Sequence, residues 1–186
     1  PDYNFEQVLI NLDLDDIFDD SVYTSAIDTV LELWIPNKGI TDLTGIEDFS
    51  QLGELFCHDN QIGALDLRYN SNLFELNCRN NLLTSLDVRN GNNQGLGYFT
   101  SLNNDSLMCI NVDDVAYANY TWEKDNHSTF SDNCNPTVYN QFIYSNNIKK
   151  KVIKIVDIFG RETNQTNQPL FYIYDDGTVE KRIRIE

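Results

Sequence analysis

Apolar and polar positions repeat at a fixed interval along the middle of the chain. Residues 52–72 and 73–93 superimpose without a gap, at a spacing of 21 residues. The matched positions are Leu55 and Leu76, Cys57 and Cys78, Asn60 and Asn81, Ile62 and Leu83, Leu65 and Leu86, Asp66 and Asp87, and Leu67 and Val88. This agreement in side-chain type indicates an internal structural repeat.

Each repeat is expected to form one coil of a solenoid. Alternation of Leu55 and Cys57 with polar neighbours predicts a short strand whose apolar side chains point inward. The chain then turns at Asn60, whose side chain can bond backbone groups that the turn leaves unpaired. The second apolar pair, Ile62 and Leu65, closes the coil against its neighbours. One coil cannot bury its own apolar face, so the coils must stack.

The same pattern extends in both directions with small changes of spacing. Upstream, the matching positions lie 22 residues before the first window: Leu33, Ile35, Ile40 and Leu43. Downstream, they lie 23 residues after the second: Phe99, Ser101 and Asn104. The extra residues fall in the Gly- and Asn-rich segment 90–97, where a loop tolerates them. About four coils of 21–23 residues follow from these spacings.

The repeat resembles the leucine-rich repeat, L-x-x-L-x-[LC]-x-x-N-x-[LI]-x-x-L. Segments 1–7, 38–49 and 109–114 further resemble exported leucine-rich-repeat proteins of Bacteroidetes. This resemblance implies an α/β-type, mostly β solenoid with an N-terminal helical cap and a C-terminal antiparallel β-meander. The cap is expected to cover the first coil with residues at helical spacing, namely Phe5, Val8, Leu9 and Leu12.

The C-terminal segment has the pattern of strands rather than of repeats. Strands are expected at 152–156, 170–174 and 179–185, the last two joined by the turn 175–177. Residues 156–162 and the closing strand resemble the C-terminal sorting domain of type IX secretion cargo, which implies a secreted protein or one on the outer cell surface. The expected organisation is a cap at 1–29, repeats at 30–114, a C-terminal cap at 115–135, a linker at 136–148 and the strand tail at 149–186.

The four cysteines occupy two kinds of position. Cys57 and Cys78 take the inward slot of neighbouring coils, where buried free thiols are favoured and a disulfide between adjacent strands is the alternative. Cys109 and Cys134 flank the end of the repeats. In the resembling family such a pair caps the array, so a Cys109–Cys134 disulfide is expected.

The charge of the chain is strongly acidic and unevenly distributed. The net charge is −16, with −18 over residues 1–147 and +2 over residues 148–186. An acidic body repels phosphate, which argues against nucleic-acid binding. It suits either cationic partners or simple solubility. No apolar run approaches the roughly 18 residues that a membrane span needs.

The sequence offers little catalytic chemistry. It has two histidines, no nucleophile–histidine pair at a supporting spacing, no phosphate-binding glycine loop and no zinc-protease signature. We therefore expect a protein that is not an enzyme and that needs no cofactor or metal. Asp13, Asp15 and Asp16 are candidate calcium ligands, but a solvated loop is the simpler interpretation.

The outward face of the strands is the candidate binding surface. Side chains between the inward positions form three rows across the coils. These are Glu32, Glu54, Glu75 and Tyr98; then Trp34, Phe56, Asn77 and Thr100; then Pro36, His58, Arg79 and Leu102. Trp34 beside Phe56 is unusual in a solvated row, and exposed aromatic residues often mark contact sites. Packing under the cap or the tail is the alternative.

These features favour an exported interaction module that binds a protein or a glycan. The candidate contact residues are Trp34, Phe56, His58, Arg79 and Tyr98. The alternative is a self-assembling subunit of an extracellular filament or surface layer, whose C-terminal strands pack on a neighbouring chain and give a homo-oligomer.

Modification is a further expectation. Short Asp-Ser or Asp-Thr segments followed by an apolar residue resemble an O-glycosylation motif of Bacteroidetes. Ser21 and Ser106 are candidates in predicted loops, whereas Thr29 is expected to enter a strand.

Overall fold

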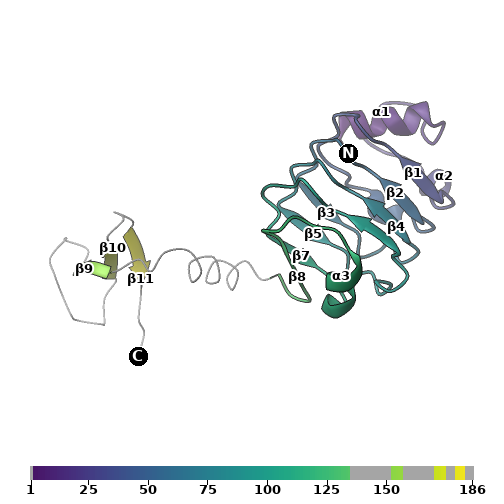
Figure 1. The fold of residues 1–186 in the computed structure, drawn as a ribbon. Coiled ribbons are helices and arrows are strands. Elements are labelled where there is room, and N and C mark those ends of the chain that lie inside the picture. Colours follow the sequence, from purple (N-terminus) through teal and green to yellow (C-terminus); the bar gives the residue numbers. More distant parts are fainter. Residues whose placement is uncertain (1, 135–151, 157–169, 175–178, 183–186) are drawn as a thin grey trace. The chain divides into compact units, whose positions relative to one another are not determined.

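The computed structural model describes residues 2–134, 152–156, 170–174 and 179–182. The chain divides into two compact units, Pro1–Asn135 and Pro136–Glu186. The first unit is a solenoid of stacked coils with short strands (Figure 1). The mostly β, leucine-rich-repeat-like fold predicted from the repeat spacing is therefore confirmed.

The first strand of each coil contributes to one parallel sheet, here called sheet A. Its order is β1 (Glu32–Trp34), β2 (Glu54–Phe56), β4 (Glu75–Asn77) and β6 (Tyr98–Thr100). The register aligns the three predicted central apolar positions and then Phe99, because each coil adds one strand. The row assignments made from the sequence spacing are thus confirmed within these strands.

Another parallel sheet, sheet B, forms around the second residue of the second apolar pair, such as Leu65 and Leu86. Its order is β3 (Ala64–Asp66), β5 (Ser85–Asp87), β7 (Cys109–Asn111) and β8 (Thr129–Ser131). The sequence predicted only that these positions close the coil. They form strands because neighbouring coils are in register there too, so the backbone of one coil bonds that of the next.

The solenoid has about five turns, not the four expected. Glu123 forms an isolated parallel bridge with Thr100 and so extends sheet A, while β8 extends sheet B. Residues 115–135 therefore contain a turn of the solenoid as well as α3 (Val115–Thr121). Aromatic stacking replaces the leucine pattern here: the ring centroids of Phe99 and Trp122 lie 4.5 Å apart.

Buried asparagines hold successive turns together. The Asn81 side chain donates to the carbonyls of Cys57 (3.0 Å) and Cys78 (3.1 Å). Its Oδ1 accepts from the Ile62 amide at 3.0 Å. Asn60 and Asn104 bond in the same way. These side chains satisfy backbone groups inside the turn, as the sequence predicted.

The residue before each of these asparagines adopts a left-handed conformation. Asp59, Asn80 and Asn103 have φ of 58°, 53° and 60°. Asn and Asp tolerate this region better than other side chains with a Cβ, so the local sequence fits the turn.

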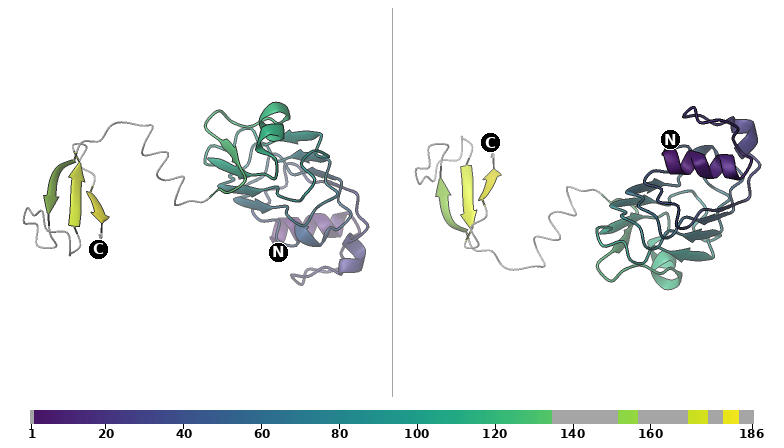
Figure 2. Two further views of the ribbon diagram at one scale, coloured as in Figure 1. Left: turned by 90° about the horizontal axis from the view of Figure 1, so that it is seen from below. Right: turned by 90° about the horizontal axis from the view of Figure 1, so that it is seen from above.

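A short helix lies at each end of the solenoid. Helix α1 (Tyr3–Asn11) lies at one end and α3 at the other (Figure 2). Phe5, Val8 and Leu9 of α1 join the core. Leu12, however, follows the last helical residue and is 47% exposed, so its assignment to the apolar face of the cap was wrong.

The remaining short elements lie on either side of β1 in the sequence. Helix α2 (Thr24–Ile27) precedes β1, and the 3₁₀ helix η1 (Ile46–Asp48) lies between β1 and β2. Thr29 lies in the turn after α2, before β1 begins, so the expectation that it enters a strand was wrong.

The cysteines divide as their positions suggested. Cys109 and Cys134 form a disulfide, whereas Cys57 and Cys78 are free and buried. Burial raises the pKa of the Cys57 thiol to about 12, because the thiolate would lose its hydration.

The second unit contains one antiparallel sheet, sheet C. Its order is β11 (Val179–Arg182), β10 (Leu170–Tyr174) and β9 (Val152–Val156). These strands match the predicted positions, except that the described part of the last one ends at Arg182. The predicted linker 136–148 lies outside the described residues. No helix within the described ranges is long and apolar enough to cross a membrane.

Candidate functional site

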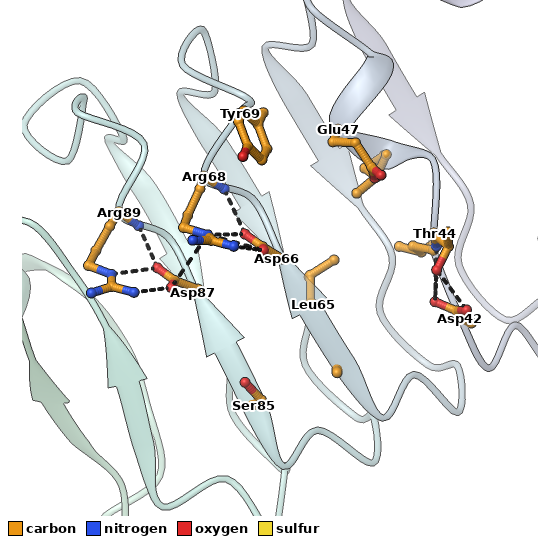
Figure 3. Close-up of a pocket in the computed structure, with 13 residues that line it drawn as sticks. Asp42, Thr44, Glu47, Leu65, Asp66, Arg68, Tyr69, Ser85, Asp87 and Arg89 are labelled. Carbon is orange, nitrogen blue, oxygen red and sulfur yellow. Dashed lines mark hydrogen bonds and ion pairs between the residues drawn. The ribbon is translucent and has the colours of Figure 1, made fainter. Parts of the chain in front are cut away.

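Two surfaces of the solenoid have features of a binding site, and the first is a pocket over sheet B. It has a volume of about 550 Å³ and is formed by β3, β5 and the segment around η1 (Figure 3). Ala64 and Ser85 are small, which leaves space above the two strands. The polar residues in its lining are Asp42, Thr44, Glu47, Asp66, Arg68, Tyr69, Asp87 and Arg89.

Two arginine–aspartate pairs dominate this pocket. The Arg68 guanidinium donates to the Asp66 carboxylate at 2.7 Å and 3.0 Å and lies 3.8 Å from Asp87. Arg89 donates to Asp87 at 2.9 Å and to the Asp132 carbonyl at 3.1 Å. Hydrogen bonds from Arg68 hold the pKa of Asp66 below its usual value. Each guanidinium is thus already neutralised by a carboxylate on its own coil.

The other two carboxylates of the pocket lining are also occupied. Asp42 accepts from the Thr44 hydroxyl at 2.8 Å, and Glu47 accepts from the Gly45 amide at 2.9 Å. A ligand would have to compete with these internal bonds. The sequence did not single out this ladder, although Asp-Leu-Arg at 66–68 and Asp-Val-Arg at 87–89 recur at the repeat spacing and could have revealed it.

The second surface is the outward face of sheet A, where three predicted residues meet. The ring centroids of Trp34 and Phe56 lie 4.7 Å apart, on paired positions of β1 and β2. The His58 ring stands edge-on to Trp34 at 5.8 Å. We call Trp34, Phe56 and His58 the aromatic patch.

The aromatic patch is accessible at its centre. Trp34 is 56% exposed and Phe56 is half-buried, so neither is covered by the N-terminal helices. His58 is more enclosed. Its Nδ1 is buried with no hydrogen-bond partner among the described residues, and its Nε2 lies 3.8 Å from Asp59. The patch thus combines exposed ring surface on Trp34 with a more enclosed imidazole beside it.

The other candidates lie away from this patch. Tyr98 is 43% exposed. However, it lies on β6, the edge strand of sheet A opposite β1, where it pairs with Glu75. Arg79 is exposed in the coil after that of His58. Asn77 and Thr100 were expected to face outward, yet they are only 6% and 2% exposed. Thr100 is covered because the additional turn at Glu123 lies beside it. In the row of Trp34, Phe56, Asn77 and Thr100, the accessible side chains are therefore the first two.

The candidate glycosylation sites and calcium ligands lie outside both of these surfaces. Ser21 and Ser106 are exposed, and the Ser21 hydroxyl donates to Asp19 at 2.6 Å. Asp15 accepts from the Asp16 amide at 2.8 Å. Within the residues described, no group of three or more His, Cys, Asp or Glu could hold a metal ion.

Comparison with known proteins finds similarity among solved structures alone. No family model and no curated protein matches the chain. Among solved structures, the functional domain of InlJ from Listeria monocytogenes, described as including a cysteine ladder, is similar at 31% identity with a TM-score of 0.44. The match covers 73% of this chain and 27% of that one, so the chain spans about a quarter of the length of this neighbour.

Proposed function

We propose that this chain is an interaction module that binds another protein through the aromatic patch, without transforming it chemically. The observation that carries the proposal is the exposure of Trp34 while its ring packs at a tilt against Phe56. Large aromatic residues at an accessible, rigid position are the usual energetic centres of protein interfaces.

The patch is well suited to recognition because its residues stand on regular strands. Trp34 and Phe56 project from paired positions of β1 and β2, whose backbones are fixed by the sheet. A partner that covered them would gain apolar burial and would not have to order a loop. A glycan that stacks on Trp34 is the alternative ligand, and binding to a glycan array instead of to peptides would favour it.

The test is selection of binders from a random-peptide display library on the full chain. Peptides enriched on the wild type should lose binding to the double variant Trp34→Ser, Phe56→Ser by about tenfold or more. The matched control is Tyr120→Ser, which removes a 91% exposed aromatic from α3. Equal binding to all three proteins would refute the proposal. A drop in the melting temperature of the double variant would instead show that the patch is structural.

Export to the cell surface or beyond is the second part of the proposal. The Cys109–Cys134 disulfide supports it, because such bonds persist in oxidising compartments. The tail that resembles a type IX sorting domain suggests the route. Protease treatment of intact native cells should digest the protein, and complete protection in unbroken cells would contradict export.

Self-assembly is the alternative function that one feature favours. Within the described residues, β9 and β11 are the edge strands of sheet C, and edge strands can accept a strand from another chain. Light scattering of the full chain should then show a multimer that disappears when residues 149–186 are deleted. A monomer before and after the deletion would exclude assembly through the tail.

A further inference from the structure

Three glutamates form a row directly beside the aromatic patch. Glu32, Glu54 and Glu75 occupy paired positions on β1, β2 and β4. Neighbouring strands lie about 4.8 Å apart, and like charges at paired positions destabilise a sheet. The ion pairs of the described residues join other side chains, so no cation of this part of the solenoid neutralises the row. We call these three residues the glutamate row.

The repulsion between the three carboxylates is strongest at Glu54, the central residue of the row. The pKa of Glu54 is raised, because its carboxylate is partly desolvated and because Glu32 and Glu75 repel its charge. Sheet B shows that the repeat can carry paired acidic residues that are neutralised, since Asp66 and Asp87 each pair with an arginine two residues later. The glutamate row lacks any such partner within the described solenoid.

The glutamate row and the aromatic patch belong to one face. Glu32 and Trp34 are two residues apart on β1, as are Glu54 and Phe56 on β2, and side chains two apart on a strand share a face. A line of carboxylates therefore borders the exposed Trp34 ring and the half-buried Phe56 ring. Carboxylates bind ammonium and guanidinium groups, and aromatic faces bind the same cations or the apolar stems that carry them.

We infer that this face recognises a basic amphipathic segment of a partner protein, with lysine or arginine on the glutamate row and apolar side chains on the aromatic patch. The inference rests on the proposed function and names the class of partner. The acidity of the whole chain, with a net charge of −16, favours the encounter with such a segment and opposes an acidic one.

The spacing of the row favours a helical segment. Across two strand intervals the row spans roughly 10 Å. Residues on one face of a helix recur about every 5.4 Å, so positions i, i+3 or i+4, and i+7 span roughly 11 Å. Alternate residues of an extended peptide would span roughly 13 Å over the same three contacts. A helix that crosses the strands thus places one basic side chain near each glutamate.

The experiment uses a fluorescently labelled Leu/Lys amphipathic peptide about 14 residues long and its Leu/Glu counterpart. Anisotropy at low salt should show binding of the Lys peptide and none of the Glu peptide. Glu54→Gln with Glu75→Gln should weaken binding about tenfold, while retaining the fold by circular dichroism. The matched control is Asp48→Asn with Asp105→Asn, which removes the same charge from exposed positions outside this face.

The outcomes separate this inference from the proposed function. Equal weakening by the two double variants would overturn it, because binding would then follow net charge alone. No weakening by the glutamate pair would also overturn it, because the row would then make no contact with the peptide. Library peptides that need Trp34 and Phe56 but are neutral or acidic would leave the proposed function standing and refute the basic partner. Peptides that ignore Trp34 and Phe56 would refute the proposed function itself.

Discussion

At the scale of single residues, asparagine has two roles that depend on burial. Asn81 lies inside the turn and bonds four backbone groups from two coils. Asn80, its neighbour, adopts a left-handed conformation and bonds Asp59 on the previous coil at 2.6 Å. The first role joins the backbone of successive turns, and the second shapes the bend.

Asn81→Ala should therefore be strongly destabilising. It leaves the buried Ile62 amide without its partner, and an unsatisfied buried group costs about 1–3 kcal/mol. It also removes one of the two bonds to each of the Cys57 and Cys78 carbonyls, which keep those from Asn60 and Asn104. We expect a loss of about 3 kcal/mol in the free energy of unfolding, measured by urea titration. Asn126→Ala is the control, because Asn126 is exposed in a turn. Comparable losses in both variants would contradict the role assigned to Asn81.

At the scale of elements, the glutamate row predicts an unusual dependence of stability on pH. The raised pKa of Glu54 means that its charged form is less favourable in the folded than in the unfolded chain. This destabilisation is present above the folded pKa and disappears as the pH falls through it. Glu54→Gln should therefore increase stability at neutral pH and have no effect near pH 3, below the usual glutamate pKa of about 4.3.

Urea unfolding at the two pH values measures this difference, with Glu47→Gln as a control outside the row. An increase in stability that persists in acid would mean that glutamine stabilises β2 for another reason, such as packing. A decrease at neutral pH would show that the Glu54 carboxylate has a favourable partner.

The sequence predicted some elements of the solenoid and not others. The repeat spacing predicted the register of sheet A, because the matched residues 55 and 76 also pair in space. It did not predict sheet B, since apolar residues at the second position are compatible with a loop as well as a strand. The fifth turn was missed because Trp122 and Phe130 replace the leucine pattern with rings packed edge to face. The contact between Trp34 and Phe56 followed from the register, whereas their exposure required coordinates.

At the scale of the whole molecule, the two units differ in charge and in core. The apolar core cluster of the solenoid runs from Phe5 to Phe130, and all of its described members belong to the first unit. Residues 1–147 carry a net charge of −18, and residues 148–186 carry +2. The solenoid thus has a complete core of its own and most of the acidity.

A fragment that ends at Asn135 should fold independently. Its thermal transition, measured by calorimetry, should lie within about 2 °C of the main transition of the full chain, because the described core contacts of the solenoid are all retained. A decrease of more than about 5 °C would show that residues 136–186 contribute to the stability of the first unit. The fragment would also lack the excess of lysine and arginine that the tail carries.

The equal residue spacing of the two sheets determines how coils can be added to such a protein. Between the second and third coils, both sheets step forward by the same 21 residues, since Glu54 pairs with Glu75 and Ala64 pairs with Ser85. A tandem copy of residues 52–72 inserted at this point would meet matching edges on both sides. Gene duplication could therefore lengthen the molecule in whole units, adding one more glutamate and one more phenylalanine to the recognition face each time.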